Sequence, residues 1–263
     1  MPRAKRSKKS PPPSAPKSAR AGRLFTDPQV SRPLPSLIVL SPLLAFYAFG
    51  LIWARPDLAV RADILVRQAI APLGLTGVLA PTWLVIGVLL AWHLVRRDPW
   101  RVSGKVLGLM AAETALLTVP LFAILAASSV ILHGYFSLEL AAPRPPATAW
   151  LAVAMTSIGA GIYEELLFRL VLVGGPLWIA RQIFRWESSG FTVAVVLVAA
   201  AIFSGAHTLD NPRWFVWDLF LFRTTAGAYL GYVFARRGFG IAVGAHIVFD
   251  LIVKLAMVFC PAA

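Results

Sequence analysis

The chain has 263 residues, of which 58% are hydrophobic and 14% are charged, and its mean hydropathy of +0.73 excludes an ordinary soluble domain. Its net charge of +13 does not indicate a nucleic-acid-binding protein, because the basic residues fall in an N-terminal tail and in short loops. We therefore expect an integral membrane protein with no nucleic-acid partner.

The N-terminal segment, residues 1–33, is basic and rich in proline. It carries nine Lys or Arg residues against one acid, Asp27, and it has prolines at 11–13 but no apolar run. Such a segment cannot bury enough apolar surface to fold. We expect a disordered cytoplasmic tail over residues 1–33 and a transmembrane helical domain over residues 34–263.

Apolar runs long enough to cross about 30 Å of hydrocarbon follow the tail. Residues Pro176 to Phe184 mix apolar side chains with Arg181, which suits a short amphipathic helix at the cytoplasmic surface. The predicted fold is therefore all-α, with about seven transmembrane helices and this amphipathic helix. The seven predicted spans are residues 34–54, 73–94, 106–132, 149–173, 191–207, 214–235 and 239–259.

The basic residues predict the orientation in the membrane. With the tail inside and alternating spans, 17 Lys or Arg residues lie on the cytoplasmic side, five lie outside and three lie within spans. Cytoplasmic loops carry such an excess of positive charge. The high Ala, Arg and Pro content is typical of a GC-rich bacterial genome. We expect a protein of the bacterial plasma membrane, with the lipid bilayer as its surroundings and the N-terminus in the cytoplasm.

Ionisable residues inside three predicted spans are the candidates for function, because each costs at least ~2.5–3.5 kcal/mol in hydrocarbon. In the fourth span, Glu165 and Arg169 are four residues apart, in the favourable order for an ion pair on a helix. Glu164 points about 100° away and has no partner nearby in the sequence. A carboxylate in such surroundings is a candidate general base for activating water.

Two histidines and one acid complete the cluster. His207 ends the fifth predicted span one turn after Phe203, where a histidine is alternatively a capping or interfacial residue. His246 and Asp250 are four residues apart in the last span, so the carboxylate can accept the imidazole N–H and fix its tautomer. Alternatively, Asp250 pairs with Lys254, which is also four residues away.

The predicted depths of Glu164 and His207 in the membrane differ, which makes it harder for the two residues to share one site. On straight helices, Glu164 lies about nine residues from the predicted cytoplasmic end of its span, whereas His207 lies about 16 residues from the same side. We expect the fifth span to be tilted, to begin deeper or to follow a re-entrant segment. Elsewhere, Glu113 and Arg223 are expected to be structural partners, either of each other or of the acidic cluster.

The pattern of the three blocks resembles the CPBP intramembrane proteases, which include the CAAX prenyl endoproteases and bacterial immunity-type relatives. That family has EExxxR, then FxxxH, then HxxxN or HxxxD on successive helices. In this chain the three blocks begin at Glu164, Phe203 and His246. The resemblance covers about residues 149–259, the expected catalytic core.

The resemblance implies proteolysis inside the membrane. Glu164 with His207 would activate a water molecule, and Glu165 with Arg169 would organise the site. His246 with Asp250 would stabilise the tetrahedral oxyanion. An ionised Asp250 would repel that oxyanion, whereas the asparagine of other members can donate to it. Asp250 is therefore protonated, orients His246 or belongs to a metal site.

A metal-dependent form of the enzyme would use Glu164, His207, His246 and perhaps Asp250 as ligands, a set that zinc accepts. We expect the metal-free form, in which no cofactor is required, because His207 can polarise water together with Glu164. The expected function is that of an intramembrane endopeptidase acting on a non-prenylated peptide or membrane-protein substrate near the cytoplasmic side.

Two other functions use the same residues. A non-enzymatic membrane scaffold or immunity protein would employ the polar cluster only to hold helices together. A proton-coupled transporter would relay protons through buried Glu and His residues, but the sequence has neither the inverted repeats nor the broken helices that favour this function.

Overall fold

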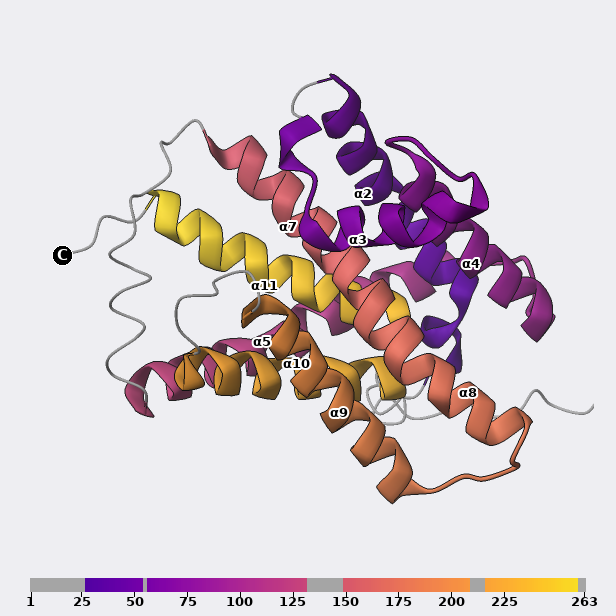
Figure 1. Cartoon of the computed structure of the whole chain (residues 1–263). Coiled ribbons are helices and arrows are strands. Elements are labelled where there is room, and N and C mark those ends of the chain that lie inside the picture. Colours follow the sequence, from indigo (N-terminus) through magenta and orange to yellow (C-terminus); the bar gives the residue numbers. More distant parts are fainter. Residues whose placement is uncertain (1–26, 54–55, 132–148, 209–215, 260–263) are drawn as a thin grey trace, which may run out of the picture.

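The computed structural model describes residues 27–53, 56–131, 149–208 and 216–259, and within these ranges all regular structure is helical (Figure 1). The all-α prediction is thus confirmed. Short 3-10 turns η1 (Pro28–Ser31), η2 (Pro56–Leu58) and η3 (Ala71–Leu73) join the early helices. The longer elements are α2 (Pro33–Trp53), α3 (Arg61–Ile70), α4 (Ala80–Arg96), α5 (Gly104–Ile131), α7 (Trp150–Glu164), the π-helix η5 (Glu165–Gly174), α8 (Gly175–Gln182), α9 (Ser189–Thr208), α10 (Trp217–Arg237) and α11 (Phe239–Phe259).

Five helical runs within the described residues are long and apolar enough to cross a membrane, so the chain is a polytopic membrane protein. They are Pro33–Trp53, Gly104–Ser128, Trp150–Gln182, Ser189–His207 and Phe239–Phe259. Trp150–Gln182 is the central one, because 67% of its apolar window is buried against 28–33% for the other four. The large apolar side chains left exposed on the outer helices face what would be lipid.

The two remaining predicted spans, 73–94 and 214–235, contain helices, but these helices are too short or too polar to count as candidate spans. The first is shortened to the 17 residues of α4, because Gly74 and Gly77 adopt positive φ angles of 77° and 115° and break the helix before Ala80. The second corresponds to α10, which carries charged residues at Asp218, Arg223, Arg236 and Arg237. Among the described residues, five helices are thus candidate spans by length and composition, where the sequence predicted about seven.

Two predicted boundaries also shift. The folded part begins before residue 34, because Pro28–Ser31 form a 3-10 turn and Val30 is fully buried in the core; residues 1–26 of the predicted tail lie outside the described residues. The predicted amphipathic segment is helical as α8, but it is not separate. It continues α7 and η5 in one line, which Figure 1 shows as a single long rod.

Small residues let the helices around the centre approach one another. Gly161 of α7 faces Ile247 of α11 so closely that a Cβ at this glycine would collide with the isoleucine side chain. Gly227 and Gly231, a small-xxx-small pair on α10, pack on α9, where Cβ atoms at these glycines would lie 3.2 Å from Phe203 and 2.8 Å from Val196. These contacts bring α7, α9, α10 and α11 together around the polar residues.

Candidate active site

The polar residues of the three sequence blocks come from four adjacent elements. Glu164 is the last residue of α7, and Glu165 and Arg169 follow on the π-helix η5. His207 lies at the C-terminal end of α9, and His246 lies in the first half of α11. Since η5 contacts α9 and α11, these side chains converge. A π-helix is rare and is frequently found at functional sites.

The length of the central span explains how Glu164 and His207 meet. Span four does not end at residue 173 but continues to Gln182, so 18 residues separate Glu164 from its end. His207 is likewise 18 residues from Ser189, where α9 begins. The two side chains therefore lie at equal distances along neighbouring antiparallel helices. The predicted boundary in error was that of span four, and α9 needs no re-entrant approach.

Glu165 and Arg169 form the predicted ion pair, which the structure confirms with 3.2 Å between Oε2 and Nε. Arg169 also donates from Nη2 to the carbonyl oxygen of Gly227 at 3.3 Å, and its guanidinium carbon lies 4.6 Å from the centre of the Phe203 ring. The side chains of Glu165 and Arg169 are 0% and 2% exposed. This sealed pair links η5 to both α9 and α10.

His246 is oriented by Glu165, a contact between residues 81 positions apart in the sequence. Its Nδ1 lies 2.8 Å from Oε1 of Glu165, and because that carboxylate is paired with Arg169, Nδ1–H is the donor. In a neutral imidazole the lone pair is then on Nε2. The sequence-based interpretation that Asp250 fixes this tautomer is wrong, because Asp250 Oδ1 lies 3.8 Å from Nε2 instead.

Asp250 is bound by Lys254, as the alternative interpretation held. Lys254 Nζ lies 2.5 Å from Asp250 Oδ2, in an i,i+4 pair on α11. An ammonium group only donates, so Oδ2 of Asp250 is the acceptor in this contact. Asp250 therefore lies beside His246 as a charge-balanced acceptor and not as a hydrogen-bond donor.

Glu164 lies between the two imidazoles. Its Oε1 is 3.4 Å from Nε2 of His207, and its Oε2 is 3.8 Å from Nε2 of His246. His207 Nδ1 lies 2.9 Å from the carbonyl oxygen of Phe203, which only accepts, so this nitrogen carries a proton. When neutral, both histidines thus direct an Nε2 lone pair toward the Glu164 carboxylate. Such a set of acceptors suits a molecule with two O–H donors, such as water.

Exposure separates the members of the cluster. The side chains of His207 and Glu164 are 27% and 14% exposed, whereas those of Glu165 and Arg169 are sealed. His246 is intermediate at 9%. A reacting molecule can therefore reach Glu164 and His207, whereas Glu165 and Arg169 are buried and can only position other groups.

The four predicted metal ligands do not form one coordination set. Two imidazole nitrogens and one carboxylate do converge, and zinc accepts such donors. However, Asp250 is bound by Lys254, and in the part of the chain that the structure describes no group of three or more His, Cys, Asp or Glu side chains is arranged to hold a metal ion.

Sequence reasoning missed several supporting groups. The carbonyl oxygens of Phe203 and Gly227 accept hydrogen bonds from His207 and Arg169. Both acceptors are backbone atoms, so no residue type in the sequence marks them. The short i,i+4 contacts were predictable from helical spacing. The bond from His246 to Glu165 was not, because it depends on how α11 packs against η5.

Residues 146–252 match the family model described as Rce1-like, Type II CAAX prenyl endopeptidase Rce1-like. The matched segment contains Glu164, Glu165, Arg169, His207, His246 and Asp250. No curated protein and no solved structure matches the chain significantly.

Proposed function

We propose that this chain, whose residues 146–252 match the Rce1-like type II CAAX prenyl endopeptidase family model, is an intramembrane protease in which Glu164 and His207 activate water for peptide hydrolysis. The observation that carries this proposal is the position of Glu164 between two imidazole Nε2 atoms, 3.4 Å and 3.8 Å away. A single carboxylate flanked in this way can bind a water molecule and accept its proton.

The proposed reaction begins with a water molecule held by Glu164 and His207 Nε2. Glu164 takes one proton as the water oxygen bonds to the peptide carbonyl carbon, and the carbonyl π electrons move onto the oxygen. As the tetrahedral intermediate collapses, the C–N bond breaks and Glu164 returns the proton to the leaving amine. The catalytic carboxylate thereby ends each cycle ionised again.

His246 is the proposed partner of the developing oxyanion. Since its Nδ1–H donates to Glu165, it must carry a second proton on Nε2 to donate to that oxyanion. The carboxylates of Glu165 and Asp250, at 2.8 Å and 3.8 Å, lie close enough to balance the resulting positive charge. Arg169 holds Glu165 in place and is therefore a positioning residue.

The proposed substrate is a non-prenylated peptide or membrane protein, cleaved without a metal ion near the cytoplasmic face of a bacterial plasma membrane. The test compares the peptide termini in membrane fractions of cells that express the wild-type chain or Glu164→Gln. New termini are expected only with the wild type. The matched control is Asp57→Asn, which removes an exposed carboxylate far along the chain from the cluster.

If the Glu164→Gln cells show the same termini as the wild type, the assignment is wrong. Purified protein that has been treated with a chelator should cleave the same substrate at an unchanged rate. Activity that disappears with the chelator and returns with added zinc would replace the metal-free proposal by the metal-dependent one.

A further inference from the structure

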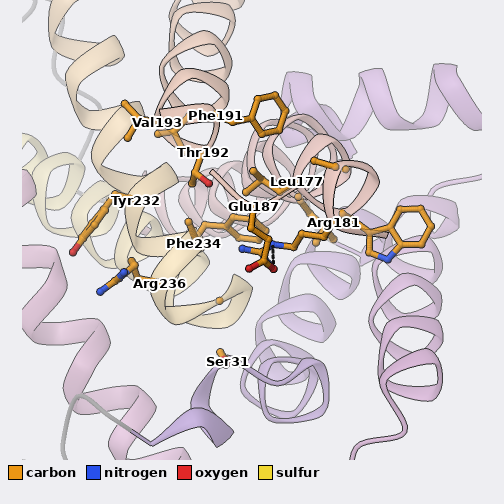
Figure 2. Close-up of a pocket in the computed structure, with 18 of the residues that line it drawn as sticks. Ser31, Leu177, Arg181, Glu187, Phe191, Thr192, Val193, Tyr232, Phe234 and Arg236 are labelled. Atoms are coloured by element: carbon orange, nitrogen blue, oxygen red, sulfur yellow. Dashed lines mark ion pairs between the residues drawn. The ribbon is translucent and has the colours of Figure 1, made fainter. Parts of the chain in front are cut away.

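A second feature, separate from the catalytic cluster, is a cavity of about 1370 Å³ at the other end of η5. Figure 2 shows its walls: Leu177 and Arg181 from α8, Phe191 to Val193 from α9, and Tyr232 to Arg236 from α10. Val88 to Arg96 of α4 contribute the remaining wall. None of Glu164, His207 and His246 lines it, so the proposed chemistry does not use this space.

The charged groups at this cavity are mainly positive. Arg96, Arg181 and Arg236 line it, and Glu187 is the one acidic residue among the lining side chains. Arg181 faces Glu187 at 3.6 Å in a solvent-exposed pair, and such pairs contribute little stability. Arg236 is exposed and has no ion-pair partner among the residues that the structure describes. The cavity therefore suits an anionic ligand.

The rest of the lining is apolar and aromatic. Trp178, Trp186 and Tyr232 line the cavity and are each more than half exposed, as tryptophans and tyrosines often are where a protein meets the membrane interface. Val193 and Leu197 add exposed aliphatic surface from α9. Arginines beside such a surface are complementary to a molecule with a negative headgroup and hydrocarbon chains.

The chain's own N-terminal segment is a poor occupant. Residues 1–26 contain eight Lys or Arg residues and no acidic residue, and they end close in sequence to Ser31, which lines the cavity. This segment and the arginine rim have the same sign of charge and repel each other.

We propose that the cavity formed by α4, α8, α9 and α10 binds one anionic phospholipid, with its phosphate at Arg181 and Arg236 and its acyl chains along Val193 and Leu197. This proposal does not depend on the proteolytic chemistry. The cavity then holds a lipid of the surrounding bilayer and not the polypeptide substrate.

Native mass spectrometry of the full chain in detergent tests the proposal. The protein is titrated with phosphatidylglycerol or with phosphatidylcholine of identical acyl chains. The expected result is binding of one phosphatidylglycerol at least about tenfold more tightly than phosphatidylcholine. Since a Lys or Arg near the membrane surface contributes on the order of 1 kcal/mol to the attraction, Arg181→Ala combined with Arg236→Ala should weaken phosphatidylglycerol binding about 30-fold.

The matched control combines Arg97→Ala with Arg101→Ala, which removes two exposed arginines that do not line the cavity. An equal loss in this control would mean that overall charge, and not the cavity, binds the lipid. Equal affinity for the two lipids would overturn the proposal. So would displacement of the lipid by inorganic phosphate alone, or by a cleavable substrate peptide. Thermal unfolding of both double variants verifies that they are folded.

Discussion

At the scale of single residues, two adjacent carboxylates have different surroundings because successive residues on a helix point about 100° apart. Glu165 is enclosed by Arg169 and His246, whereas Glu164 faces the two Nε2 atoms and remains partly exposed. Burial and ion pairing suit Glu165 to a positioning role. Partial exposure and the neighbouring imidazoles suit Glu164 to the chemistry.

Replacing Arg169 by methionine should destabilise the protein by about 3–5 kcal/mol, because the Glu165 carboxylate would remain buried without its cation. The measurement is the free energy of unfolding, or the shift of the thermal transition, in detergent. Arg169→Met combined with Glu165→Gln should recover part of the loss. A single variant as stable as the wild type would contradict the ion-pair description.

Replacing Asp250 by asparagine should leave cleavage within several-fold of the wild-type rate, because Asp250 does not hold the tautomer of His246. Replacing Glu165 by glutamine should reduce the rate far more, since Glu165 accepts the Nδ1 proton. Both rates are measured on the same substrate with folded protein. A greater loss in Asp250→Asn than in Glu165→Gln would reverse the assigned roles.

The site could be predicted from the sequence as far as its contacts follow the helical repeat. The pairs Glu165 with Arg169 and Asp250 with Lys254 both follow from i,i+4 spacing. The spacing of His246 and Asp250 predicted a tautomer contact that tertiary packing instead assigns to Glu165. Contacts between distant helices depend on rotation and depth, which one sequence does not specify.

At the scale of elements, the approach of α7 to α11 sets the distance from Glu165 to His246. Gly161 lies one turn before Glu165, and Ile247 directly follows His246. Their contact leaves no room for a Cβ on the glycine. The two helices can therefore bring a carboxylate and an imidazole within hydrogen-bond distance.

Gly161→Ala should lower cleavage by at least about tenfold, because a displacement of about 1 Å at a catalytic site can cost that much or more. Adding Ile247→Ala should restore part of the activity by making room for the new methyl group. Gly108→Ala is the control, since a Cβ there would meet no atom of the described chain within 4 Å. If the second substitution gives no rescue, contact between these two residues is not what sets the geometry.

The existence of the helices was easier to predict than their ends. All seven predicted apolar runs are helical, although α3 was not predicted. The continuation of span four through η5 and α8 crosses Gly174, Gly175 and Pro176, which usually mark a helix end. Proline is tolerated near the start of a helix, and here it lies at the start of α8. That continuation is what aligns Glu164 with His207.

At the scale of the whole molecule, buried charge pairs tie distant helices together where water is scarce. Glu113 of α5 pairs with Arg237 at the end of α10, with 2.7 Å between Oε2 and Nε, so Glu113 has a structural role, as expected, with Arg237 as its partner. Asp63 of α3 is fully buried and accepts hydrogen bonds from Tyr47 of α2 and from Arg67. These pairs account for charges that the catalytic cluster does not use.

Glu113→Gln should lower the free energy of unfolding by about 2 kcal/mol, because the charged hydrogen bonds to Arg237 are largely buried. Adding Arg237→Gln to this variant should lower the free energy of unfolding by much less than a further 2 kcal/mol, roughly the loss caused by the first substitution. A double-mutant cycle in detergent measures this coupling. Strictly additive effects would show that the pair does not join α5 to α10.

The most direct measurement of the central claim is the cleavage rate of purified Glu164→Gln on a substrate identified from the membrane fractions. We expect a loss of about 10²-fold or more relative to the wild type, with an unchanged thermal transition, because glutamine cannot take a proton from water. A variant that cleaves at the wild-type rate would contradict the role of Glu164 as the base.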